Sequence, residues 1–269
     1  MIIPMRSHIL AAALGVLATA AGAGAQTPDS VLLEELTWTE VRDAVRAGKT
    51  TIIIPAGGTE QNGPHMALGK HNVRVKALSQ DIARHLGDAL VAPVIAYVPE
   101  GAIAPPTAHM RYPGTITTPD DAFQKVLEWA ARSFKQHGFR NIVLLGDHGG
   151  TQAAQKVVAS RLNREWAATG VRVHAIEEYY RAAETEVPRL LRGRGYSDAE
   201  LGRHAGLTDT ALMLATDARL VRTDRLRPGS PGDGVDGDPT RATAELGRPG
   251  VEMIVSRTVD AVRKSITHR

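Results

Sequence analysis

Two short apolar runs, each followed at once by a glycine-rich polar loop, constrain the fold of this chain most. Residues 51–55 read Thr-Ile-Ile-Ile-Pro, and residues 141–145 read Asn-Ile-Val-Leu-Leu. A continuous apolar run of this length is typical of a strand buried on both faces, as in a parallel sheet covered by helices. Further strands are predicted at 90–98, which Pro93 interrupts, and at 171–176.

Helical patterns lie between these runs. They are predicted at 39–47, 73–85, 120–137, 153–169, 209–218 and 252–265. Thr118 or Asp120 is the expected N-cap of the third. Strands that alternate with helices predict an α/β fold, with a mainly parallel sheet and crossover helices. Residues 229–250 are rich in Gly, Pro and Asp and are predicted to form a long loop.

The first 25 residues have the pattern of a secretory signal peptide. Arg6 and His8 precede an apolar stretch at 9–20, and Ala-Gly-Ala at 23–25 forms a small-x-small cleavage site. We therefore expect cleavage after Ala25, a periplasmic or secreted protein, and a single domain at 26–269. An uncleaved anchor is the alternative, but the apolar stretch is short for a membrane span.

Composition excludes several classes of function. The net charge is +3 without a Lys/Arg run, and 4% of residues are aromatic, which disfavours a nucleic-acid partner. The chain has no GxxxxGK[ST], GxGxxG or GxSxG motif and no second similar lobe. It also has no cysteine, so a metal site must use imidazole, carboxylate or amide ligands. We expect a small-molecule substrate and no membrane partner after signal cleavage.

Polar side chains with metal-binding chemistry follow both apolar runs. They are Glu60, Asn62, His65 and His71 after the first run and His148 after the second, with His204 and Asp209 near a later helix start. The carboxyl ends of parallel strands meet at one edge of a sheet, so these groups are predicted to lie together. Carboxylate and imidazole suit Zn²⁺ and Mn²⁺. The alternative is a polar loop whose histidines only bind backbone groups.

These segments resemble the creatininase family. Residues 54–68, I-P-A-G-G-T-E-Q-N-G-P-H-M-A-L, are similar to the family's P-x-G-[SA]-x-E-Q-H-G-P-H-L-P-L. Y-P-G-T-I at 112–116, H-G-F-R with G-D-H-G-G at 137–150, H-A-G-L-T-D-T at 204–210 and G-V-D-G-D-P at 234–239 match later motifs in order. The matches span residues 33–265.

The resemblance implies a three-layer α/β fold, a homo-oligomer in the form of a ring-like hexamer, and hydrolysis of amide C–N bonds, often in cyclic amides. It also implies Zn²⁺ or Mn²⁺, commonly as a metal pair. Glu60 and His148 match metal ligands of the family. Asp209 matches a Glu that acts as ligand or acid/base.

Two departures from the family pattern affect the metals. Asn62 replaces a His, and His71 replaces the Asp that bridges the two ions. An amide oxygen is a poor Zn²⁺ ligand, and one imidazole nitrogen binds only one ion. We therefore predict a single divalent ion held by Glu60, His71 and His148, with Asp209 as a further candidate ligand; Zn²⁺ is the expected ion and Mn²⁺ the alternative. Degeneration to an inactive homologue is the alternative.

The predicted reaction is metal-assisted hydrolysis of an amide or cyclic amide. Asp209, His65 and His204 are the candidate catalytic residues, and Glu177 or Glu178 is an alternative proton shuttle. Asn62, His109 and Arg111 are predicted to contact the substrate, since the loop at 100–111 borders the same strand ends. Cleavage of a lactone or another non-amide bond, and a non-catalytic periplasmic binder, stay open as alternatives.

Overall fold

A parallel four-stranded sheet forms the centre of the molecule. The computed structural model describes residues 29–267, so the predicted leader at 1–25 lies outside the described residues. The strands are β1 (Thr51–Ala56), β2 (Ala89–Val91), β3 (Asn141–Gly146) and β4 (Arg172–Ala175). Their order is β2-β1-β3-β4, and every neighbouring pair is parallel. The predicted α/β class is thereby confirmed.

Helices connect the strands and follow the last one. The α-helices are α1 (Trp38–Arg46), α2 (Lys70–Leu86), α3 (Asp120–Gln136), α4 (Gln152–Glu165), α5 (Glu178–Arg181), α6 (Val187–Arg192), α7 (Asp198–Leu201), α8 (Leu207–Asp217) and α9 (Ala244–Thr267). A π-helical turn at Ala182–Glu186 joins α5 to α6. Among residues 29–267, no helix is both long and apolar enough to cross a membrane.

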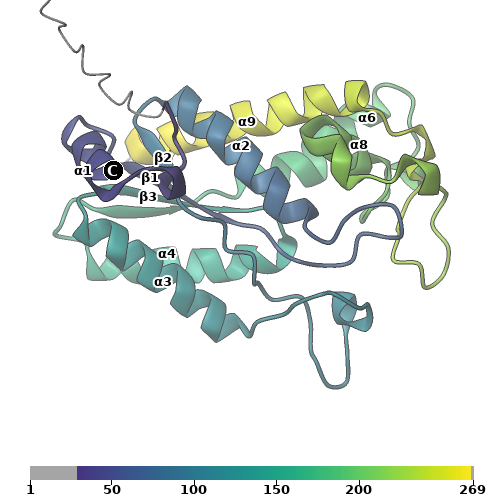
Figure 1. Ribbon diagram of the computed structural model, residues 1–269, viewed down its shortest axis with the longest axis horizontal. Coiled ribbons are helices and arrows are strands. Elements are labelled where there is room, and N and C mark those ends of the chain that lie inside the picture. Colours follow the sequence, from purple (N-terminus) through teal and green to yellow (C-terminus); the bar gives the residue numbers. More distant parts are fainter. Residues whose placement is uncertain (1–28, 268–269) are drawn as a thin grey trace, which may run out of the picture.

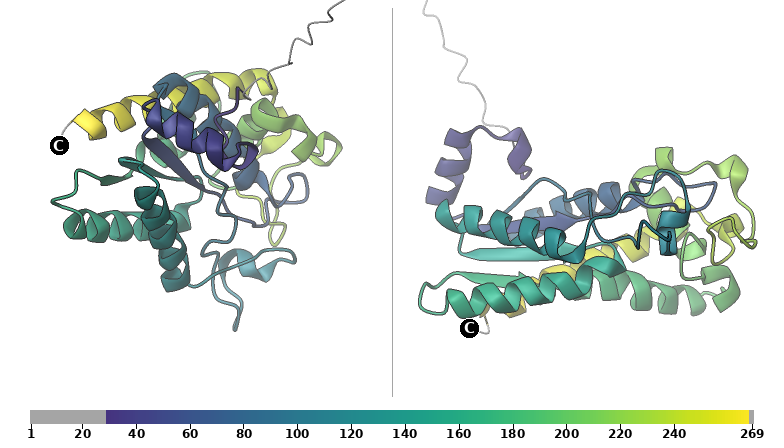
Figure 2. Two further views of the ribbon diagram at one scale, coloured as in Figure 1. Left: turned by 60° about the vertical axis from the view of Figure 1, so that its left-hand side comes forward. Right: turned by 90° about the horizontal axis from the view of Figure 1, so that it is seen from below.

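The sheet is covered on both faces, which gives three layers (Figures 1 and 2). Ile53, Val143 and Leu145 face a core shared with α2, α8 and α9. Ile52 and Ile54 point to the opposite face, where the core is shared with α3 and α4. Side chains alternate along a strand, so a run that is apolar at every position supplies both cores at once.

The chain changes direction between β1 and β3. Helix α2 follows β1 and packs on one face, whereas α4 follows β3 and packs on the other. This is a topological switch point, and ligands of open α/β sheets bind at such points beside the carboxyl ends of the strands. The loops that follow β1 and β3 are those that carry Glu60 and His148.

Some element boundaries differ from the prediction. Strand β2 has three residues instead of nine, because Pro93 cannot donate to the ladder and the chain leaves the sheet. Helix α2 begins at Lys70, so His71 lies in the first helical turn and not in the loop. The N-cap of α3 is Pro119, so both predicted caps were wrong.

The last helix is longer than predicted. Helix α9 begins at Ala244 and continues through Pro249, so part of the predicted loop at 229–250 is helical. Gly247 lies against α8 so closely that a Cβ atom there would stand 1.9 Å from the Ala211 carbonyl oxygen. Gly247, which falls in the predicted loop, therefore allows α9 and α8 to pack closely, and this packing compensates for the low helix propensity of glycine.

Candidate metal centre

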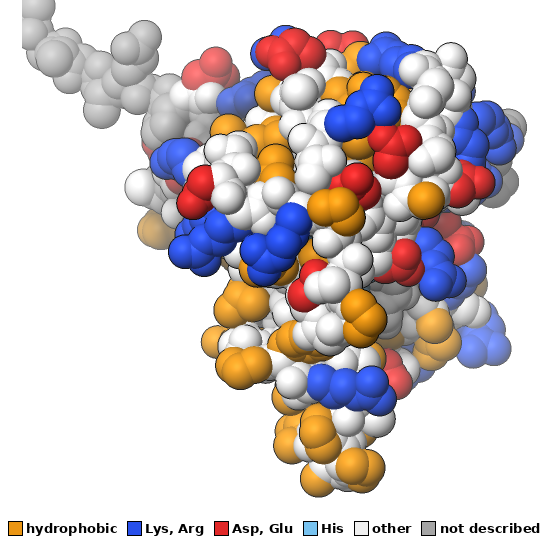
Figure 3. All heavy atoms as spheres, turned by 90° about the vertical axis from the view of Figure 1, so that its right-hand side faces the viewer, with side chains coloured by type: hydrophobic (Ala, Val, Ile, Leu, Met, Phe, Trp, Pro, Cys, Tyr) orange, Lys and Arg blue, Asp and Glu red, His pale blue; other side chains and the backbone are white. Residues whose placement is uncertain are grey.

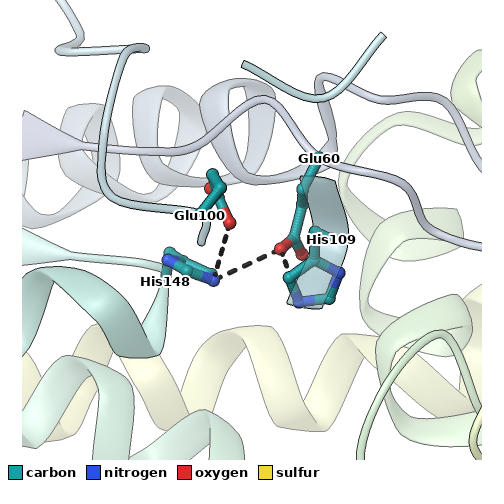
Figure 4. Close-up of side chains that lie close together, drawn as sticks. All are labelled: Glu60, Glu100, His109 and His148. Atoms are coloured by element: carbon teal, nitrogen blue, oxygen red, sulfur yellow. Dashed lines mark ion pairs between the residues drawn. The ribbon is translucent and has the colours of Figure 1, made fainter. Parts of the chain in front are cut away.

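Four side chains converge at the switch point: Glu60, Glu100, His109 and His148 (Figure 4). One donor atom from each lies within 4.8 Å of the others. Glu60 follows β1 and His148 follows β3, while Glu100 and His109 lie on the long segment between β2 and α3. The group therefore assembles from three separate parts of the chain.

The spacing of the donors suits a small divalent ion. His148 Nε2 lies 3.2 Å from Glu60 Oε2 and 3.1 Å from Glu100 Oε2. His109 Nε2 lies 3.1 Å from the same Glu60 oxygen. Ligands bound at 2.0–2.1 Å around a tetrahedral Zn²⁺ stand about 3.3 Å apart. The three printed separations are within a few tenths of an ångström of that spacing, and all four donors lie within 4.8 Å of one another.

Three of the four carboxylate oxygens of this group lack hydrogen-bond partners among the described residues. Glu60 Oε2 and both oxygens of Glu100 are buried, and no residue among 29–267 gives them a hydrogen bond of good geometry. Burial, and then the charge of Glu60, raise the pKa of Glu100 to about 10. Buried polar atoms without partners are costly, and a cation between them removes that cost. Two carboxylates and two imidazoles thus fit Zn²⁺ or Mn²⁺.

Two glycines allow the segments to approach. A Cβ atom on Gly58 would stand 2.6 Å from Glu100 Oε1, and one on Gly150 would stand 2.6 Å from the Pro99 carbonyl oxygen. These positions lie in the loops after β1 and β3. The glycine-rich character of both loops is therefore what lets the Pro99–Glu100 segment reach the strand ends.

His71 lies behind Glu60. Its Nε2 is 2.7 Å from Glu60 Oε1, and its Nδ1 is 2.5 Å from Asp147 Oδ1. Although burial and Lys70 oppose it, the two carboxylates raise the pKa of His71. Both ring nitrogens are thus directed at carboxylates, and Nε2 meets the oxygen of Glu60 that does not face His109 and His148. This geometry suits orientation of Glu60 better than the predicted ligand role.

Asp209 is held by two cations. Its Oδ2 accepts from Lys70 Nζ at 3.1 Å, and its Oδ1 accepts from Arg74 Nη1 at 3.1 Å. Burial would raise the pKa of Asp209, but Lys70 and Arg74 outweigh it and hold that pKa well below its usual range. Asp209 therefore stays ionised, and its oxygens are directed at these two side chains.

His204 borders the four-residue group. Its Nε2 lies 2.9 Å from the Gln61 carbonyl oxygen, and its ring centroid is 4.6 Å from that of His109. Burial, and then the charge of Lys70, lower the pKa of His204 to about 4. A carbonyl oxygen only accepts, so Nε2 carries the hydrogen and Nδ1 is left as an acceptor.

His65 and Asn62 have local partners instead. His65 Nε2 lies 3.1 Å from the Thr210 hydroxyl, and Asn62 Nδ2 donates to the Glu60 carbonyl oxygen at 2.9 Å. Neither residue lines a cavity beside the four-residue group. The catalytic role of His65 and the substrate contact of Asn62 stay predictions.

Two hollows that share lining residues adjoin the group. A cavity of about 200 Å³ is lined by Glu60, Lys70, His148, His204 and Asp209 among others. A wider pocket of about 820 Å³ shares His109 and His204 with it and continues to Arg111. Figure 3 shows this side of the molecule, where apolar side chains gather on the projecting segment between β2 and α3. Ile103 of that segment is 70% exposed.

Comparison with known sequences identifies the family. A sequence model described as Creatininase, creatinine amidohydrolase, matches residues 34–262, most of the chain. The chain belongs to the creatininase family. Members of this family are metal-dependent amidohydrolases, so the chain is an enzyme of that type whose substrate is not specified by the family alone.

Named relatives differ in their substrates. The chain is 26% identical over 255 residues to the creatinine amidohydrolase of Pseudomonas putida, covering 87% of this chain and 97% of the relative. It is 27% identical over 237 residues to the mycofactocin precursor peptide peptidase of Mycolicibacterium smegmatis, covering 79% and 84%. A crystal structure of creatininase superposes with a TM-score of 0.74 at 26% identity, covering 90% and 100% of the two chains.

Metals occur in similar creatininase structures. One mutant creatininase is of the Zn–Zn type, and it matches with a TM-score of 0.72 at 26% identity over 88% of this chain and 98% of its own. Another creatininase is described with Mn and matches with a TM-score of 0.71 at 26% identity, covering 88% and 99%. These findings confirm a divalent metal as the expected class of cofactor.

Sequence reasoning missed two of the four donors. Glu100 was not considered as a ligand, and His109 was expected to contact substrate. The position of Glu100 in the sequence could have indicated it as a ligand. Glu100 closely follows the predicted strand at 90–98 and so stands at the end of another strand. Only the fold shows that the segment after β2 turns back over β1 and β3.

Replacing Glu100 should weaken metal binding without unfolding the chain. Glu100→Gln keeps the size of the side chain but removes an anionic ligand, so we expect at least a 10-fold rise in the Kd for Zn²⁺, measured by competition with a chromophoric chelator. The matched control is Glu252→Gln, on an exposed residue of α9. An unchanged Kd for Glu100→Gln would remove Glu100 from the ligand set.

Proposed function

We propose that this creatininase-family chain is a one-metal amidohydrolase that cleaves the amide C–N bond of an extended small molecule or short peptide. The observation that carries the proposal is the group of Glu60, Glu100, His109 and His148, with three buried carboxylate oxygens to which no residue among 29–267 gives a hydrogen bond. The ion we propose is Zn²⁺, since two imidazoles and two carboxylates at this spacing suit it.

A single ion is proposed because the remaining donors are engaged or are poor ligands. The residues that the family resemblance implies for a second ion are at the positions of Asn62, His71 and Asp209. His71 lies between two carboxylates, and Asp209 is bound by Lys70 and Arg74. Asn62 donates to backbone carbonyls, and its oxygen, which has no hydrogen-bond partner among residues 29–267, is a neutral amide oxygen and a poor Zn²⁺ ligand.

The side chains around the cavity have distinct proposed tasks. A bound divalent ion supplies Lewis acidity for a carbonyl group and for water. His204 is neutral at pH 7 and presents Nδ1 as a hydrogen-bond acceptor, which fits the N–H of an amide substrate. Asp209 orients Lys70 rather than moving a proton, because its pKa is held low. Arg111, at the rim of the wide pocket, is placed to meet an anionic group.

The size of the pocket supports an extended substrate. The wide pocket of about 820 Å³ is within the range of pockets that hold drug-sized ligands, and it opens directly beside His109 and His204. A relative with peptidase activity shows that the family includes enzymes for such substrates. We also propose, from the sequence, that the protein is exported and forms a homo-oligomer.

A substrate panel tests this function. Chelated protein is reloaded with Zn²⁺ or Mn²⁺ and assayed against creatinine, other cyclic amides, short peptides, formamides and lactones. We expect metal-dependent release of an amine from a peptide or N-substituted amide. Stoichiometric metal without turnover of any amide would support the non-catalytic binder, and turnover of lactones alone would support a C–O hydrolase.

A further inference from the structure

Lys70 is a buried cation that borders the metal centre without belonging to it. It is the first residue of α2, and its side chain is 1% exposed. Its Nζ lies 3.1 Å from Asp209 Oδ2 and 3.9 Å from Glu60 Oε1. The same side chain lines the cavity of about 200 Å³. A lysine is almost never fully buried unless it is paired, so these two carboxylates account for its position.

The two oxygens of Glu60 face different surroundings. Oε2 faces His109 and His148, where the single ion is proposed to bind. Oε1 faces the other way, toward His71 Nε2 at 2.7 Å, His204 Nδ1 at 3.8 Å and Lys70 Nζ at 3.9 Å. Glu60 is therefore shared between the four-residue group and a second group of donors.

The groups around the ammonium are of the types that bind divalent ions. Glu60 Oε1 and Asp209 Oδ2 lie 3.9 Å and 3.1 Å from Lys70 Nζ, and His204 Nδ1 lies 3.8 Å from Glu60 Oε1. Arg74 holds only the other oxygen of Asp209, Oδ1, and leaves Oδ2 to Lys70 and the Ala205 N–H. A positive charge is needed between the two carboxylates, and Lys70 supplies it.

We propose that the Lys70 ammonium group permanently occupies the position of a second cation, so that the site binds one metal ion where a creatininase of the Zn–Zn type binds two. This inference rests on the proposed one-metal function and explains it physically. The fixed charge excludes a second ion by repulsion and by filling its place. It also balances the charges of Asp209 and of Glu60 at Oε1. It faces the cavity in which the carbonyl oxygen of a substrate would gain negative charge.

Metal stoichiometry tests the inference without a substrate. Wild type, Lys70→Ala, Lys70→Met and Lys70→Arg are equilibrated with excess Zn²⁺, freed of unbound ion by gel filtration, and analysed by mass spectrometry for zinc per chain. We expect one ion in the wild type and two in Lys70→Ala. Lys70→Met and Lys70→Arg should stay at one, because both keep the volume filled. Lys76→Ala, on the same helix and 40% exposed, is the matched control and should also stay at one.

The outcomes separate this inference from the proposed function. A Lys70→Ala protein that still binds one ion would overturn the inference alone. A wild type that binds two ions would overturn the inference and the one-metal part of the proposed function, but not the hydrolase class. A wild type that binds no ion would overturn the proposed function and the inference with it.

A measurement on the wild type covers the case in which Lys70→Ala fails to fold. Mn²⁺ is titrated into the chelated protein and followed by electron paramagnetic resonance. We expect the signal of isolated ions at every ratio of metal to protein. The spectrum of an exchange-coupled pair would show a second ion beside the first and would contradict the proposal.

Discussion

The His148→Ala protein is expected to lose its metal ion and its activity together. His148 Nε2 lies beside both carboxylates of the four-residue group, at 3.2 Å from Glu60 and 3.1 Å from Glu100. Its removal leaves His109 as the one imidazole of that group. Loss of a residue that merely orients a ligand costs about 10–100-fold in metal affinity or activity, so loss of a ligand should exceed about 100-fold in kcat/KM.

Metal analysis and a control variant make this result interpretable. Zinc per chain should fall to a small fraction of the wild-type value, measured at equal protein concentration after gel filtration. His137→Ala replaces an exposed histidine at the C-cap of α3 and should change neither quantity. If metal-free His148→Ala protein kept wild-type turnover, the metal-dependent mechanism would be wrong for this chain.

The Asp147→Asn protein is expected to be strongly destabilised. Asp147 is buried and accepts from Arg74 Nη2 at 2.7 Å, from Arg74 Nε at 3.0 Å and from the Tyr179 hydroxyl at 2.5 Å. Burial would raise the pKa of Asp147, but the Arg74 guanidinium and His71 outweigh it and hold that pKa below its usual range. Neutralising one partner leaves the Arg74 charge buried without its main counter-ion, which typically costs about 3–5 kcal/mol.

Urea denaturation at pH 7 measures this loss in the free energy of unfolding. Metal-free protein is used, because bound metal would stabilise the folded state by mass action. Asp81→Asn is the matched control, since the Asp81–Arg84 pair spans 3.7 Å with both side chains about half exposed. Exposed pairs contribute little, so its denaturation midpoint should match the wild type. Equal midpoints for Asp147→Asn and wild type would show that Asp209 alone can balance Arg74.

These two predictions concern neighbouring residues with different tasks. His148 faces the four-residue group, and Asp147 points back into the molecule toward Arg74, His71 and Tyr179. Arg74 in turn binds Asp209, and Asp209 binds Lys70. A network of buried charges therefore connects the strand end of β3 to the start of α8. It positions both Glu60, through His71, and the ammonium group of Lys70.

The family resemblance identified in the sequence is confirmed, and so is the metal-dependent hydrolase class. Glu60 and His148 could be selected because each follows a continuous apolar strand, and parallel strands bring their carboxyl ends together. The departures at Asn62 and His71 were also visible in the sequence. The consequence of these departures for the metal site was not visible, because the sequence alone does not show which side chains lie where a family ligand has been replaced.

The sequence by itself determined the layer architecture, since runs that are apolar at every position have to be buried on both faces and the helical patterns between them have to supply the cover. Only the tertiary structure decided the composition of the metal centre. Glu100 and His109 belong to it because a loop passes closely over Gly58 and Gly150. Lys70 borders it because α2 begins three residues earlier than its sequence pattern indicates. Backbone paths and helix starts depend on packing between segments distant in the chain, which no local pattern of residues records.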